Sequence, residues 1–230
     1  MSFDLALSPA DGVPDRPALP AELTSSGVVA IVRARSTTHV PAAVEAIVAA
    51  GITCVELTLT MPDALTSLAS LVSRTGSAAC IGAGTVLSAE QARACLDAGA
   101  KFLVAPSAVP DVVATAVAAG VPCLPGALTP SEIVSAWRSG AAAVKLFPAS
   151  VGGVRYLRDV RAPLPGIALV PTGGVAIGDV ADYLSAGAIA VGLGSPLFAD
   201  VFDTGDIAAL TARTRQVVDA VRRAREGRPV

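Results

Sequence analysis

The chain has 230 residues, a length that suits one α/β barrel domain. Its 17 basic and 19 acidic residues nearly cancel, and no basic stripe or aromatic ladder favours a nucleic-acid partner. Hydrophobic residues make up 53% and aromatic residues only 3%, so the core must be built from Ala, Val, Leu and Ile, as in helices packed on a parallel sheet.

Residues 1–20 hold four prolines with little periodicity, which predicts a flexible Pro-rich tail with a short helix near Ala18–Ser25. Residues 21–230 are predicted to form one domain, in which short apolar runs alternate with Ala-rich helical stretches. Eight runs are predicted as strands: Val28–Arg33, Ile52–Leu59, Ala79–Ala83, Phe102–Ala105, Val121–Leu124, Ala143–Phe147, Ala168–Pro171 and Ala188–Gly192.

Helices are predicted between these strands, for example at Val40–Ala50 and Asp179–Ala186. Ser88 with Gln91, and Thr129 with Glu132, have the spacing of capping boxes. Several helical stretches end in Ala-Gly, where glycine can take the left-handed conformation that closes a helix. The last segment, 206–226, places apolar residues on one helical face: Ile207, Leu210, Val217, Val218 and Val221.

The mean hydropathy of +0.63 raises the question of a membrane span. The longest uncharged run, Val112–Ser131, contains three prolines and two glycines, so it cannot be one spanning helix. The start of the chain has Asp4 and no basic residue before its apolar residues, unlike a signal peptide. The four cysteines lie far apart, which favours buried thiols in a reducing compartment. We therefore predict a cytoplasmic protein without a membrane partner.

Eight units of this regularity favour a closed (β/α)8 TIM barrel, with an open doubly wound sheet as the alternative. The active site of such a barrel lies at the C-terminal ends of its strands. Polar residues that interrupt or end the predicted strands are therefore candidate site residues. They are Arg33, Glu56, Thr85, Lys145 and Thr172.

Lys145 lies inside the apolar run 143–147. Burial disfavours the charged ammonium form, and a neutral amine can attack a ketone to form a Schiff base. Glu56 interrupts another strand, where a carboxyl group can move protons during such a reaction. The alternative for both residues is a salt bridge that fills the barrel. Thr58 and Thr60 share the face of Glu56 by period-two alternation, so that face is polar, like the wall of a site.

Glycines follow the seventh and eighth predicted strands, at Gly173-Gly174 and Gly194. Loops at these two places of a barrel often bind phosphate through backbone N–H groups. Ser195, before Pro196, is expected to cap a short helix and to offer a hydroxyl donor. These loops predict a site for phosphate or another oxyanion.

His39 is the only histidine, and it precedes a predicted helix. A zinc site usually needs several imidazoles, and a Ser–His–Asp triad needs a suitably placed one. We therefore interpret His39 as a helix-start or surface residue, and we expect neither a metal nor another cofactor.

With these residues in view, the chain resembles the 2-keto-3-deoxy-6-phosphogluconate (KDPG) and 4-hydroxy-2-oxoglutarate (KHG) aldolase family from about residue 27 to 198. The resemblance implies a class I pyruvate aldolase, homotrimeric and metal-free, that binds a small keto acid. Six motifs in order carry it: Val28–Arg33, Val55–Leu59, Gly82–Leu87, Val144–Ala149, Pro171–Val175 and Gly194-Ser195.

By this resemblance, the Schiff-base lysine is Lys145 and the proton-shuttling glutamate is Glu56. Thr85 would hold the pyruvyl carboxylate, with Thr172 and Arg33 lining the site. The distal phosphate would lie at the two glycine loops, which contain Gly173, Gly174, Gly194 and Ser195.

The chain departs from the family pattern at Thr60. Members that act on the gluconate substrate usually carry Leu-Arg-Thr-Pro here, whereas this chain has Leu59-Thr60-Met61-Pro62. Galactonate relatives, as the resemblance suggests, also lack the arginine. The expected reaction is reversible cleavage of a KDPG-type 2-keto-3-deoxy-6-phospho sugar acid to pyruvate and glyceraldehyde 3-phosphate. The same chemistry on the galactonate isomer or an unphosphorylated keto acid is an alternative, and a phosphate-binding barrel isomerase or transferase is the rival class.

Overall fold

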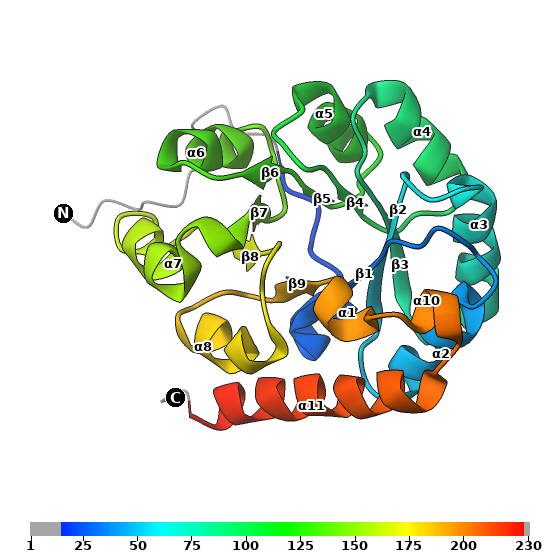
Figure 1. The fold of residues 1–230 in the computed structure, drawn as a ribbon. Coiled ribbons are helices and arrows are strands. Elements are labelled where there is room, and N and C mark those ends of the chain that lie inside the picture. Colours follow the sequence, from blue (N-terminus) through cyan, green and yellow to red (C-terminus); the bar gives the residue numbers. More distant parts are fainter. Residues whose placement is uncertain (1–14, 228–230) are drawn as a thin grey trace.

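The computed structural model describes residues 15–227, in which helices surround a curled set of strands (Figure 1). The strands are β1 Val28–Val32, β2 Cys54–Thr58, β3 Cys80–Gly84, β4 Leu103–Val104, β5 Cys123–Leu124, β6 Gly126–Ala127, β7 Val144–Leu146, β8 Leu169–Pro171 and β9 Val191–Leu193. The helices are α1 Ala21–Ser26, α2 Val40–Ala49, α3 Ala64–Thr75, α4 Ala89–Asp97, α5 Pro110–Ala118, α6 Pro130–Arg138, α7 Gly153–Arg161, α8 Val180–Ser185, α9 Ser195–Phe198, α10 Val201–Thr204 and α11 Ile207–Glu226, with 3-10 turns η2 Ala149–Val151 and η3 Ile177–Asp179.

The strands pair in parallel and divide into two sheets, one ordered β5-β4-β3-β2-β1-β9 and the other β6-β7-β8. Each predicted strand is present in part. The fifth, predicted at Val121–Leu124, is β5 Cys123–Leu124. After Pro125 comes a further short strand, β6, which was not predicted and belongs to the second sheet. An isolated bridge between Thr172 and Gly192 links the ends of β8 and β9. The α/β class and the curled parallel sheet are confirmed. The continuous eight-stranded barrel is not confirmed among residues 15–227, where the strands form two sheets.

Alternate side chains of the strands enter two separate apolar cores. Val28, Ala30 and Val32 of β1 belong to the larger core, which also contains buried residues of the surrounding helices. Val29 and Ile31 belong to a smaller inner core, whose other members come mainly from neighbouring strands. The inner core also includes Phe102, Leu124, Val170 and, from α1, Leu23. The space enclosed by the strands is thus filled by apolar side chains of this inner core.

Of the two predicted capping boxes, one forms completely and the other only in part. Thr129 Oγ1 accepts the N–H of Glu132 at 3.3 Å, and the Glu132 carboxylate accepts the N–H of Thr129 at 2.8 Å, which confirms that capping box. Ser88 Oγ accepts the N–H of Gln91 at 3.2 Å. The Gln91 side chain, however, accepts the N–H of Leu87 at 2.7 Å rather than that of Ser88, so only half of the second predicted box forms.

The last helix, α11, runs along one side of the molecule and packs against α8, α2 and α9 (Figure 1). Asp206 caps it, since its carboxylate accepts the N–H of Ala209 at 2.9 Å. Leu210, Val217 and Val221 are buried, as the apolar face of this segment predicts.

Residues 1–14 of the predicted tail lie outside the described residues. In the rest of that segment, Arg16 donates hydrogen bonds to the carbonyl oxygens of Trp137 and Ala141 at 2.6 and 2.9 Å. Its guanidinium carbon lies 3.6 Å from the centroid of the Trp137 ring. The short helix predicted near Ala18 begins at Ala21. Within residues 15–227, no helix combines the length and the apolar character needed to cross a membrane.

Candidate active site

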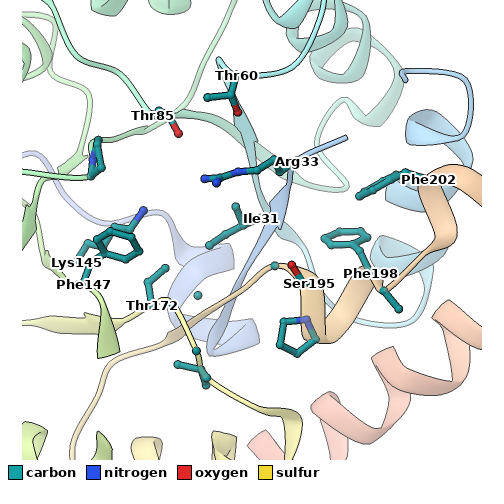
Figure 2. A pocket seen from close by; sticks show the side chains of 18 residues that line it. Ile31, Arg33, Thr60, Thr85, Lys145, Phe147, Thr172, Ser195, Phe198 and Phe202 are labelled. Carbon is teal, nitrogen blue, oxygen red and sulfur yellow. The ribbon is translucent and has the colours of Figure 1, made fainter. Parts of the chain in front are cut away.

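A cavity of about 440 Å³ lies where the predicted site residues converge, at the C-terminal ends of the strands (Figure 2). Every predicted site residue except Glu56 lines it. These are Arg33, Thr60, Thr85, Lys145, Thr172, Gly173, Gly174, Gly194 and Ser195.

Lys145 enters the cavity from the middle of β7, and only 7% of its surface is exposed. Its backbone is held on both sides, because its register partners are Gly126 of β6 and Val170 of β8. Its Nζ atom lies 5.1 Å from the centroid of the Phe147 ring and points towards the open centre of the cavity (Figure 2). The amine is thus shielded from bulk water but accessible from the cavity.

Glu56 lies in the middle of β2 and is 2% exposed. Burial raises the pKa of its carboxyl group, and the charges of Lys145 and Arg33 offset part of that rise. Gly84 leaves room for this carboxylate, because a Cβ atom there would collide with it. Glu56 therefore interacts electrostatically with both Lys145 and Arg33.

The salt-bridge alternative for Lys145 and Glu56 is not what the structure contains. The ion pairs among the described residues all join exposed side chains, and none of them links these two groups. Among residues 15–227, the Lys145 amine therefore faces the cavity without an ion pair to Glu56.

Thr60 and Thr85 line the cavity, and the buried Thr58 lies next to Thr60. Thr58 Oγ1 donates to the carbonyl oxygen of Val32 at 3.2 Å and lies 3.0 Å from Thr60 Oγ1. Thr85 has a φ of 61°, in the left-handed region that β-branched residues rarely adopt. Residues in such strained conformations cluster at active sites and ligand-binding sites, where the surrounding structure holds them in place.

The glycine loops form the opposite side of the cavity. Gly173 and Gly174 have φ values of 84° and 79°, and a Cβ atom at Gly173 would come within 2.8 Å of the Phe147 ring. Ser195 was expected to cap α9, but this prediction is wrong. The N-cap is Gly194, and Ser195 is the first residue inside the helix, where its hydroxyl makes no cap bond. Its place in the cavity lining is as expected.

Apolar members of the cavity lining were missed from the sequence. Phe198 and Phe202 stack with ring centroids 4.9 Å apart at the end away from Lys145 (Figure 2). Ile31 and Phe147 lie two residues from Arg33 and Lys145, so period-two alternation could have placed both on the inward face.

The charged residues that line the cavity, Arg33 and Lys145, are both basic, so the cavity suits an anionic ligand. Within residues 15–227, no three His, Cys, Asp or Glu side chains lie close enough together to hold a metal ion. His39 is the N-cap residue of α2, and a Cβ atom at Gly205 would come within 2.9 Å of its ring. The four cysteines are buried and free.

Comparison with known proteins places this geometry in a family. A family model described as KDPG and KHG aldolase matches residues 19–228. The probable 2-dehydro-3-deoxy-6-phosphogalactonate aldolase of Rhizobium meliloti is 34% identical, over 84% of this chain and 92% of its own length. The 2-dehydro-3-deoxy-phosphogluconate aldolase of Pseudomonas aeruginosa is 38% identical, over 76% of this chain and 80% of its own length.

Solved structures agree with the sequence relatives. A structure described as native KDPGal superposes with a TM-score of 0.81 at 34% identity, over 86% of this chain and 96% of that one. The KDPG aldolase of Legionella pneumophila, described with pyruvate captured as a covalent carbinolamine intermediate, gives a TM-score of 0.80 at 26% identity, over 86% of this chain and 96% of that one. The chain belongs to the KDPG and KHG aldolase family.

Proposed function

We propose that this protein is a class I aldolase that reversibly cleaves a 2-keto-3-deoxy-6-phospho sugar acid to pyruvate and glyceraldehyde 3-phosphate. The observation that carries the proposal is the Lys145 amine, which is buried in β7, faces the cavity and has no ion-pair partner among the described residues. The carbinolamine named for the Legionella relative is the first covalent species that an amine of this kind forms with pyruvate.

The reaction begins when the neutral Lys145 amine attacks the C2 ketone. Glu56, directly or through a water molecule, moves protons as the carbinolamine loses water and becomes an iminium ion. Glu56, directly or through a water molecule, then takes the proton of the C4 hydroxyl as the C3–C4 bond breaks. The electron pair of that bond passes to the iminium, which releases the aldehyde and leaves an enamine. The enamine is protonated at C3 and hydrolysed, which releases pyruvate and restores the amine. General acid–base assistance of this kind contributes about 10²–10⁴ in rate.

The two anionic ends of the substrate bind at different parts of the cavity in this proposal. Arg33 and Thr85, with Thr172 beside them, hold the carboxylate next to the reacting ketone. The glycine loops hold the phosphate through backbone N–H groups, which only glycine allows to approach so closely. Ser195 adds a hydroxyl donor at the same end.

Two observations favour the galactonate isomer over the gluconate isomer as the substrate. Thr60 lines the cavity at the position where gluconate-type members usually carry arginine. The Rhizobium relative is also named for the galactonate substrate. A side-by-side measurement of kcat/KM for the gluconate-type, galactonate-type and unphosphorylated keto acids tests this. A preference of tenfold or more for the gluconate isomer would contradict it.

We further propose that the two sheets close into a (β/α)8 barrel and that the protein is a cytoplasmic homotrimer. The carbonyl of Pro125 accepts the N–H of Lys145 at 3.0 Å, and Ala105 donates to the carbonyl of Leu124 at 3.2 Å, so residues 123–127 contact both sheets. The trimer rests on family resemblance, and the exposed apolar side chains of Leu65 and Leu87 are compatible with it. Light scattering after size exclusion would contradict the trimer if it gave a monomer mass.

Trapping with borohydride tests the Schiff base directly, because the chain contains only two lysines, Lys145 and the exposed Lys101. With pyruvate present, we expect mass spectrometry to find a reduced adduct on Lys145 and none on Lys101. Lys145→Met should abolish the adduct and the cleavage activity while the protein stays folded, since Met is apolar and of similar length. Lys101→Met should retain both. An adduct on neither lysine of the wild-type protein would end the proposal of a Schiff base.

A further inference from the structure

The short helix α9 forms the cavity wall on the side away from Lys145 (Figure 2). Ser195, Pro196 and Phe198 line the cavity from this helix. The next residue, Ala199, also lines it and has φ 47° and ψ −120°. Residues with a Cβ atom rarely adopt this conformation. It costs about 1–3 kcal/mol and persists only where neighbouring groups hold it. The wall therefore ends in a strained turn.

Arg213 of α11 holds that end of the wall from outside the cavity. Its Nε atom donates to the carbonyl oxygen of Leu197 at 2.7 Å, and its Nη2 atom donates to that of Phe198 at 3.1 Å. Both bonds are partly buried, and the donor is charged, which makes hydrogen bonds of this kind stronger than neutral ones. The planar guanidinium thus ties the last two residues of α9 to the long helix behind it.

Few other groups could replace Arg213. The last carbonyl groups of a helix have no partner further along it, so they need donors from elsewhere. Ala199 already uses its own N–H to donate to the carbonyl of Ser195 at 2.8 Å. Removal of the guanidinium would leave two partly buried carbonyl groups without this donor and would loosen the strained turn. Ligand binding would then have to order the α9 wall. The free-energy cost of that ordering would weaken the binding of ligands that contact the wall.

We propose that Arg213 is a positioning residue that fixes the α9 wall for the phosphate-bearing end of the substrate. It contributes nothing to the covalent step, since it lies outside the cavity lining and contacts the backbone of α9 rather than Lys145 or Glu56. This inference rests on the proposed function, because it takes the ketone to bind at Lys145 and the phosphate to bind on the side of Ser195.

The experiment compares a ligand that reaches the wall with one that does not. For each variant, we would measure KM and kcat for the phosphorylated keto acid, and separately the pyruvate concentration that gives half-maximal borohydride trapping on Lys145. For Arg213→Met, we expect KM for the phosphorylated acid to rise about tenfold, the scale of one lost hydrogen bond to a charged group. Half-maximal trapping by pyruvate and kcat should stay within about twofold of wild type.

Two further variants control for loss of charge and for global stability. Arg215→Met removes the same side chain from an exposed position of α11, and it should match wild type in both measurements. Arg213→Lys can donate to one of the two carbonyl groups but not in the planar fork, so its KM should fall between wild type and Arg213→Met. Should Arg213→Met fail to fold, Arg213→Lys shows the same split between the two ligands.

An equal change in KM and in pyruvate trapping would overturn the inference, because it would mark Arg213 as a general structural residue. The inference would also be overturned if Arg213→Met were less heat-stable but kept the wild-type KM for the phosphorylated keto acid. A wild-type protein that traps no pyruvate would instead reject the proposed function, and the inference with it.

Discussion

Lys145 and Glu56 occupy different electrostatic surroundings although both are buried. The Lys145 amine faces the cavity and the π-face of Phe147, whereas the Glu56 carboxyl is enclosed near Gly84 and does not line the cavity. Burial raises the pKa of Glu56, so this group exchanges protons closer to neutral pH than an exposed carboxyl group does. The arrangement leaves the proposed nucleophile open to the cavity and keeps the proposed proton carrier behind the cavity lining.

Glu56→Gln should keep the shape of the side chain but remove its proton exchange. We expect kcat/KM to fall by about 10²–10⁴. In the wild-type enzyme, activity should rise with pH through an inflection above the ordinary glutamate pKa of 4.5, because burial raises the pKa of Glu56. The Gln variant should lack this inflection. Pyruvate formation measured across pH checks both points, and an inflection that persists in the variant would assign it to another group.

The same substitution has an expected effect on stability that depends on pH. The folded protein holds the Glu56 proton more tightly than the unfolded chain does, since burial raises the pKa of this carboxyl group. The wild-type protein should therefore lose stability as the pH rises from 4.5 to beyond the raised pKa of Glu56 in the folded state. The Glu56→Gln variant should not show this loss. Urea unfolding at several pH values measures this difference, and a Gln variant that loses stability in parallel with wild type would contradict it.

At the scale of elements, the ends of the strands and the starts of the helices determine where the site residues lie. The strands are short, from two to five residues, and the polar site residues lie in them or just beyond them. Helix starts then fix the direction in which each chain segment leaves the site. The box at the start of α6 is the best formed of these, because the Glu132 carboxylate accepts both the Thr129 and the Leu128 N–H groups.

Thr129→Ala should destabilise the protein by about 1 kcal/mol, because it removes the hydroxyl that accepts the Glu132 N–H. Ser135→Ala, at an exposed position inside the same helix, should be neutral or slightly stabilising because alanine favours helices. Chemical denaturation of the two variants and wild type gives the comparison. Equal free energies of unfolding for the two variants would show that the box contributes nothing to stability.

For the molecule as a whole, the inner core supports the floor of the cavity. Phe102 is fully buried in this core, and a Cβ atom at Gly82, the register partner of Glu56, would come within 2.5 Å of its ring. The phenylalanine thus fills the space that the missing side chain of Gly82 leaves. This contact connects the packing of the strand interior to the strand that carries Glu56.

Phe102→Ala should lower the free energy of unfolding by about 3–5 kcal/mol, because it opens a cavity in the inner core. Gly82→Ala should cost about 1–3 kcal/mol through overpacking against the Phe102 ring. The double variant should be less destabilised than the sum, because the smaller side chain at 102 makes room for the new methyl group. Val151→Ala, at a position 67% exposed, is the control and should change little. Additive costs in the double variant would contradict the contact.

The sequence by itself determined the order of the β/α units, the helix at 206–226 and the chemical type of the site residues. These follow from local periodicity, from capping and from the rarity of Lys145 and Glu56 inside apolar strands, all of which act over a few residues. Tertiary structure alone decided the division of the sheet at Pro125, the place of Glu56 outside the cavity lining and the aromatic wall of Phe198 and Phe202. It also brought Arg213 onto α9. Those features depend on contacts between segments far apart in the chain, whose geometry no local pattern encodes.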